Sequence, residues 1–129
     1  MRLVRSTLLT IVFALALAAC VLKPVQVSNI KSGQVAVWQD SRLTQSWTLD
    51  QVQLASLSRW FADRSYGWSH SIVPYGPHLV IALEHFDGSI SSVDIFQTLV
   101  IVATQAGQLQ QRFSSEEIVL LRTQLGAPQ

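Results

Sequence analysis

Three histidines and nearby carboxylates in the middle of the chain are the residues whose types are best suited to chemistry. His70, His78 and His85 are spaced eight and seven residues apart, and Glu84 and Asp87 lie close to the last of them. Zinc sites normally use histidines or cysteines at closer spacing on one helix or hairpin. Glu84 and His85 are consecutive, so in an extended strand their side chains point to opposite faces. We therefore expect exposed or singly hydrogen-bonded histidines and no metal site.

No serine has the surroundings that a hydrolase requires of its nucleophile. The nearest candidate is Gly67-Trp68-Ser69-His70, which lacks the second glycine of the Gly-x-Ser-x-Gly motif. The chain also lacks a phosphate-binding glycine loop and a dinucleotide fingerprint. The sequence therefore predicts a protein that is not an enzyme, with no catalytic residues and no cofactor. The alternative is a weak enzyme that acts on the cell wall through a histidine or carboxylate of residues 66–88.

The segment 66–78 is the best candidate for a binding surface. It has two prolines and carries five side chains suited to contacts, namely Tyr66, Trp68, His70, Tyr75 and His78. Exposed tyrosine and tryptophan provide large contact areas at a small entropic cost, and they could stack on the sugars of peptidoglycan. The alternative interpretation is that Tyr66 and Trp68 cover the core beneath a helix, because tryptophan is highly buried on average.

The N-terminus has the order of features expected of an exported protein. Arg2 and Arg5 precede an apolar run, Leu8 to Ala19, that is too short to span about 30 Å of hydrocarbon. This favours a signal peptide over a transmembrane anchor or a helix packed on the domain. The run ends in Leu17-Ala18-Ala19-Cys20, which resembles the lipobox of bacterial lipoproteins. Cys20 is the only cysteine in the chain and therefore cannot form an internal disulfide.

The resemblance to lipoproteins implies a covalent membrane anchor on Cys20. It implies cleavage before Cys20, a diacylglyceryl thioether on the sulfur and an acyl chain on the new N-terminus, which together anchor a protein stably. Val21 stands where an aspartate would resemble the inner-membrane retention signal of enteric bacteria. The expected location is therefore the periplasmic face of the outer membrane rather than the inner membrane. The predicted organisation is a signal peptide at 1–19, a lipidated tether at 20–34 and a small domain at 35–129. Val25 and Val27 alternate with polar residues, so an edge strand within the tether is the alternative for that part.

Charge and length limit the partners that the mature chain would bind. Cleavage leaves 110 residues, and the loss of Arg2 and Arg5 changes the net charge from +1 to −1. The remaining Lys and Arg are not clustered, so no nucleic-acid partner is expected. This length suffices for one domain with a modest core. The expected partners are the membrane, through the lipid, and an envelope protein (a machine subunit, or a toxin or hydrolase that it inhibits) or peptidoglycan.

Capping signals predict two helices. The first is expected at about 49–63, with Thr48 and Gln51 as a capping box and Trp47 and Val52 as a hydrophobic staple. Its buried positions are Leu54, Leu57 and Phe61, with Trp60 beside them.

The second helix begins after Ser114, which forms a capping box with Glu117, and Phe113 and Ile118 are spaced as its staple. Gly126 is placed to end the helix. Its buried positions are Ile118, Leu121 and Leu125.

Between the helices the sequence predicts a four-stranded antiparallel meander. The strands are expected at 79–85, 89–95, 98–104 and 108–113, with Asp87-Gly88 and Ala106-Gly107 in turns. Over 91–104 a helix capped by Ser91 is the alternative, but the β-branched residues of 98–104 favour strands. Shorter strands are possible at 35–38, 45–47 and 69–73. The predicted fold is α+β: a helix packed on the meander, with a closing C-terminal helix, after a cleaved signal helix.

Overall fold

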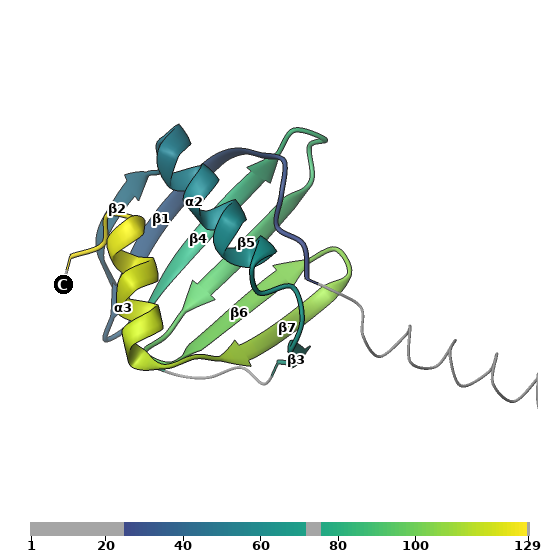
Figure 1. The fold of residues 1–129 in the computed structure, drawn as a ribbon. Coiled ribbons are helices and arrows are strands. Elements are labelled where there is room, and N and C mark those ends of the chain that lie inside the picture. Colours follow the sequence, from purple (N-terminus) through teal and green to yellow (C-terminus); the bar gives the residue numbers. More distant parts are fainter. Residues whose placement is uncertain (1–24, 72–75, 129) are drawn as a thin grey trace, which may run out of the picture.

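The computed structural model describes residues 25–71 and 76–128, which form one α+β domain. A seven-stranded antiparallel sheet has the strand order β2-β1-β4-β5-β6-β7-β3, and two helices lie on one of its faces (Figure 1). The predicted signal peptide, Cys20 and Tyr75 lie outside the described residues. The elements are β1 (Ile30–Gln39), β2 (Arg42–Thr48), α2 (Gln51–Ala62), β3 (Ser69–His70), β4 (His78–His85), β5 (Ile90–Ile95), β6 (Leu99–Thr104), β7 (Gly107–Arg112) and α3 (Ser115–Gln124).

The predicted meander is confirmed as β4-β5-β6-β7, and residues 91–104 form strands rather than a helix. In β5 the side chains alternate between the two faces, with Val93 and Ile95 buried against the helices. Such alternation buries one face of a sheet against the helices. On the other face Phe96, Leu99 and Ile101 form a second, smaller buried cluster. Gly88 lies in the turn between β4 and β5, and Gly107 follows the turn between β6 and β7. Both have positive φ, which glycine adopts without a steric penalty.

The sheet is wider than the meander because strands add at both of its edges. The β1–β2 hairpin pairs with β4, and the two-residue strand β3 pairs with β7. The short strands expected at 35–38 and 45–47 are thus parts of longer ones.

The start of the domain also differs from the expected boundary at residue 35. β1 begins at Ile30, Val25 and Val27 are buried in the core, and the Val25 N–H donates to the Ser65 carbonyl at 2.8 Å. The alternating apolar side chains of this segment enter the core, so residues 25–34 belong to the fold and are not a free tether.

Helix α2 begins two residues later than its first capping signal indicates. Its N-cap is Asp50, which forms a reciprocal capping box with Gln53, whereas Thr48 ends β2 and donates to Gln34 Oε1 at 2.9 Å. Val52 is exposed, so the expected pair of Trp47 and Val52 does not form a staple. Leu49 and Leu54 occupy the staple positions instead, and both pack against Gly33, where an added Cβ would lie 3.1 Å from each.

Helix α3 has the ends that its sequence predicts. Ser114 is the N-cap and accepts from the Glu117 N–H at 3.2 Å, which is one of the two hydrogen bonds of the predicted capping box. At the other end Gly126 has a φ of +79°, its N–H donates to the Thr123 carbonyl, and the Ala127 N–H donates to the Arg122 carbonyl at 3.0 Å. These two bonds form a Schellman motif, which satisfies carbonyls that the helix itself leaves unpaired.

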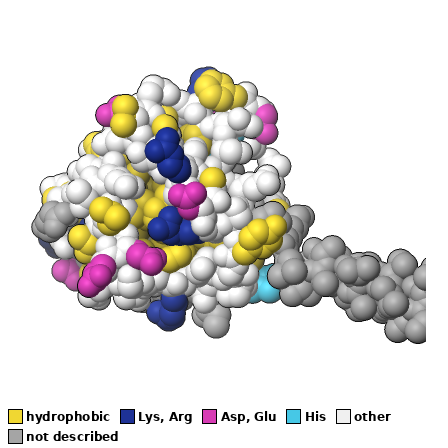
Figure 2. All heavy atoms as spheres, in the orientation of Figure 1, with side chains coloured by type: hydrophobic (Ala, Val, Ile, Leu, Met, Phe, Trp, Pro, Cys, Tyr) yellow, Lys and Arg dark blue, Asp and Glu magenta, His cyan; other side chains and the backbone are white. Residues whose placement is uncertain are grey.

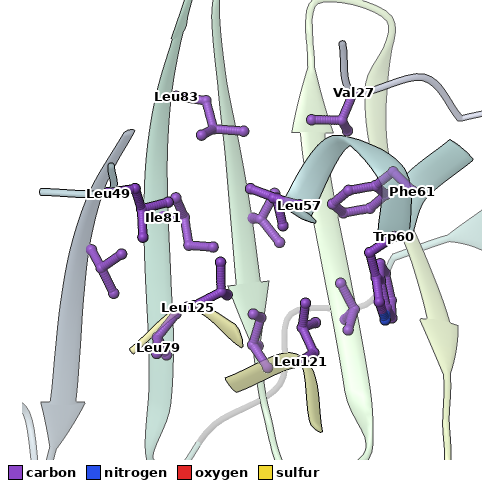
Figure 3. Close-up of a cluster of buried hydrophobic side chains, with 14 of the residues drawn as sticks. Val27, Leu49, Leu57, Trp60, Phe61, Leu79, Ile81, Leu83, Leu121 and Leu125 are labelled. Atoms are coloured by element: carbon purple, nitrogen blue, oxygen red, sulfur yellow. The ribbon is translucent and has the colours of Figure 1, made fainter. Parts of the chain in front are cut away.

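The core lies between the helices and one face of the sheet. The predicted positions Leu57 and Phe61 of α2, Leu121 of α3 and Leu125, the C-cap of α3, are all buried. Figure 3 shows side chains from both helices gathered with those of β4, including Ile81. Burial of this kind supplies most of the driving force for folding.

Candidate functional site

Trp68, one of the five residues of the predicted binding loop, packs against the core rather than standing free. Its ring stacks on Phe61 with centroids 5.7 Å apart and lies 6.0 Å from Phe113. Its Nε1–H donates to the Arg64 carbonyl at 2.6 Å. Tyr66, two residues earlier, is exposed. The structure thus places Trp68 as a half-buried lid on the aromatic end of α2.

The two histidines of the same loop lie far apart in the sheet. His70 belongs to β3, at one edge, whereas His78 begins β4. Four strand spacings separate β3 from β4, which is a distance of roughly 19 Å. Among the described residues, therefore, the predicted loop does not bring its side chains to one site.

His85 and Ser91 have the hydrogen-bond geometry of a catalytic base and its nucleophile. The Ser91 hydroxyl lies 2.7 Å from His85 Nε2, and His85 Nδ1 donates to the Ser28 carbonyl at 2.7 Å. Ser91, however, is only 5% exposed and faces the helices. A nucleophile must be reached by its substrate, so this pair serves to fasten residues 25–29 to the β4–β5 hairpin. In the described part of the chain no three His, Cys, Asp or Glu side chains are grouped to hold a metal ion.

The other face of the sheet has no helix over it in the part of the chain that the structure describes, and we call it the helix-free face (Figure 1). Strand register places Leu43, Trp38 and His78 side by side on this face, in β2, β1 and β4. The row continues to Phe96, whose ring stacks on the His78 ring with centroids 4.7 Å apart. Trp38 and Leu43 are 37% and 53% exposed. An aromatic and an aliphatic side chain thus present a compact apolar surface.

This row lies at one end of the sheet, where β1 turns into β2, β4 begins and β5 turns into β6. We call it the His78 end. The His78 ring is held in place by the stacking on Phe96 and by Nδ1, which donates to the Gly76 carbonyl at 2.9 Å. A fixed imidazole loses little conformational freedom when a partner contacts it.

The row next to it on the helix-free face has small side chains and one carboxylate. Register aligns Ala36, Val80 and Asp94 across β1, β4 and β5. Partial burial raises the pKa of Asp94, and the nearby His78 opposes this by favouring the charged form. Because these side chains are shorter than those of Trp38 and His78, the two rings project further from the sheet than the neighbouring row does. Together these residues form a shelf with an apolar rim and a single acidic group.

A pocket of about 440 Å³ lies beside the shelf, between α3 and the turns of the His78 end. Its size is within the range of small-molecule and side-chain binding pockets. Pro77 and Gln97, the neighbours of His78 and Phe96 in the chain, contribute to its wall together with Val119 and Arg122 of α3. Among the described residues, the lining also includes Ser115, Ile118, Ala127 and Pro128.

A second hollow separates the two helices. Figure 2 shows hydrophobic atoms at its base with basic and acidic side chains beside them. Its wall includes Arg59, Arg64 and Glu117, and the Arg64 guanidinium lies 4.4 Å from the centroid of the Trp60 ring. The Arg64 side chain thereby covers the aromatic base of the hollow, which is smaller, at about 220 Å³. The His78 end therefore remains the better site.

Sequence reasoning identified His78 but not Trp38, Leu43 or Phe96 as its neighbours. For Trp38, which follows the buried Val37, period-2 alternation was the available signal for the face, but only the strand order shows that Trp38, Leu43, His78 and Phe96 are adjacent. No helix in residues 25–71 and 76–128 is long and apolar enough to cross a membrane. In comparisons with known proteins, no family model, curated protein sequence or solved structure matches this chain.

Proposed function

We propose that this chain is a lipid-anchored lipoprotein of the bacterial envelope whose domain acts as a non-enzymatic binding module. The anchor would be the lipidated Cys20, and the location would be the periplasmic face of the outer membrane. The sequence Leu17-Ala18-Ala19-Cys20, the apolar run before it and the absence of any other cysteine support the anchor. Val21 in place of an aspartate supports the outer membrane.

One observation carries the binding role: exposed Trp38 and Leu43 stand beside the fixed His78–Phe96 stack. Exposed aromatic side chains on a rigid sheet are typical anchors of protein interfaces, because they bury much surface and lose few rotamers. The pocket beside the shelf would accept a side chain of the partner. We therefore propose an envelope protein as the partner, either a subunit of an assembly or an enzyme or toxin that the domain blocks. Peptidoglycan, whose sugars could stack on Trp38, is the competing ligand.

The anchor is tested by labelling cells with a fatty-acid analogue. The chain should take up the label, Cys20→Ser should not, and density gradients should place the labelled chain with outer-membrane markers. A Cys20→Ser chain that is still labelled, or a wild-type chain found mostly with inner-membrane markers, would contradict the anchor or the location.

The binding surface is tested with Trp38→Ala and with Val52→Ala as the matched control, since Val52 is an exposed apolar residue on α2. Partners would be captured from detergent-extracted envelopes and then measured by titration, with sedimentation on purified peptidoglycan in parallel. Trp38→Ala should weaken binding by more than about tenfold, which is the effect of truncating an interface anchor, while Val52→Ala should not. Equal affinities for both variants at an unchanged melting temperature would refute the shelf. Binding to peptidoglycan but to no envelope protein would show that the ligand is peptidoglycan rather than a protein.

A further inference from the structure

The end of the sheet opposite His78 carries two large apolar side chains in water. This end holds the β4–β5 and β6–β7 turns, and we call it the Phe86 end (Figure 1). Phe86 is 72% exposed and Ile90 is 70% exposed. Neither side chain is needed for the turn between them, because Asp87 Oδ1 accepts from the Ser89 N–H at 2.9 Å and from the Ser89 hydroxyl at 2.6 Å. The formation of this turn therefore does not account for two large apolar side chains exposed to water.

The segment through which the chain enters the domain runs beside this turn. The Asn29 carbonyl accepts from the Phe86 N–H at 3.0 Å, next to the bond between His85 and the Ser28 carbonyl. At its other end, Val25 is bonded to Ser65, which precedes the exposed Tyr66. Residues 25–29 thus run from the neighbourhood of Tyr66 to that of Phe86.

Chain length limits how far the proposed lipid can lie from the point at which the chain enters the domain, at Val25. Cys20 precedes Val25 by five residues, which span at most about 18 Å when fully extended. Because residues 25–34 are part of the fold, no long tether separates the domain from the bilayer surface. The side of the domain where the chain enters must then remain near the lipid headgroups.

We propose, on the basis of the lipid anchor proposed above, that Phe86 and Ile90 insert into the interfacial region of the bilayer that holds Cys20. Apolar side chains, including phenylalanine and aliphatic residues, are buried at the boundary between lipid headgroups and acyl chains when a protein surface lies on a bilayer. Anchoring makes the second contact intramolecular, so even a weak apolar contact is populated. The domain would then have a fixed orientation on the membrane.

The charges near this end indicate an apolar rather than an electrostatic contact. Lys31 and Glu84 form an exposed ion pair at 3.8 Å, and Asp87 has a lowered pKa because its carboxylate accepts two bonds from Ser89. These three groups carry no excess of positive charge that would attract anionic lipids. The contact should therefore persist at high salt, where exposed charges are screened over a few ångströms.

The test uses the full lipidated chain in vesicles of phosphatidylethanolamine and phosphatidylglycerol. Lipidation occupies the sulfur of Cys20, so Ile90→Cys and Leu43→Cys would each introduce the only free thiol. Leu43 is the matched control, since it is also an exposed aliphatic residue in the sheet but lies at the His78 end. Each thiol would carry an environment-sensitive fluorophore, and its access to aqueous iodide and to a quencher on the lipid tails would be measured.

The label at Ile90 should be several-fold less accessible to iodide than the label at Leu43, and only the Ile90 label should be quenched from the lipid. Adding Phe86→Ser to Ile90→Cys should raise its iodide access, and about 1 M salt should change neither label. Mass spectrometry of the same samples reports the anchor. A chain without lipid overturns the anchor and this inference with it. A lipidated chain whose two labels respond alike overturns only the insertion of the Phe86 end.

Discussion

Trp68 offers the sharpest test of how the region after α2 is built. Truncation to alanine removes the stacking on Phe61 and the contact with Phe113. A fully buried tryptophan costs about 3–5 kcal/mol when truncated, so a half-buried one should cost about 2–3 kcal/mol. The lost hydrogen bond from Nε1 to the Arg64 carbonyl adds about 1 kcal/mol. We expect a total of about 3–4 kcal/mol, which for a domain of this size lowers the Tm by at least about 12 °C.

Two further variants separate packing from binding at this position. Trp68→Phe keeps an aromatic ring against Phe61 but loses the indole N–H, so it should cost about 1 kcal/mol. Tyr66→Ala, at an exposed neighbouring position, should change stability by less than about 0.5 kcal/mol. Thermal melts followed by near-ultraviolet circular dichroism would rank the three variants. A Trp68→Ala protein that melts within a few degrees of wild type would show that residues 66–70 do not pack on α2 as described.

The remaining predictions concern the two helices and the carboxylate of the shelf. Leu57→Ala, in the fully buried stripe of α2, should cost about 2–5 kcal/mol, whereas Ser114→Ala, which removes the N-cap of α3, should cost about 0.5–2 kcal/mol. Urea melts test this order, and equal, negligible losses would contradict the helix packing. Asp94→Asn should raise the Tm at neutral pH, because burial raises the pKa of Asp94 and the charged carboxylate is therefore destabilising there. Its advantage should shrink as the pH falls through the raised pKa and vanish below 3.8, the value for an unperturbed aspartate; a difference in Tm that does not depend on pH would refute this origin.

Local signals were sufficient for the meander and for α3. The turn between β4 and β5 requires a positive φ at position 88, which glycine adopts more readily than other residues. Ser114 and Gly126 mark the two ends of α3. The start of α2 was ambiguous because two overlapping capping signals, at Thr48 and at Asp50, have the same spacing. Thr48 pairs with Gln34 of β1 in the sheet, which leaves Asp50 as the N-cap. This pairing depends on tertiary structure and cannot be read from the local sequence.

The candidate site depended on information that local patterns lack. The loop 66–78 is continuous in sequence, but its ends join strands on either side of three others, so His70 and His78 separate. Conversely, Leu43, Trp38 and His78 become neighbours because the N-terminal hairpin inserts against β4. The tether was misjudged for a related reason, since Val25 and Val27 are buried only when the helices and the sheet are both present.

The position of β1 between β2 and β4 has a consequence for the order in which the chain folds. The meander strands pair with their immediate neighbours in sequence, whereas Ile30 of β1 pairs with His85 across more than fifty residues. Closing such a span costs more entropy and slows the step that requires it. We expect the β1–β2 hairpin, which emerges first during synthesis, to dock last. Until the hairpin docks, the edge of β4 is unpaired and can pair with a strand of another chain. The edge most prone to aggregation therefore stays exposed until the slowest step of folding is complete.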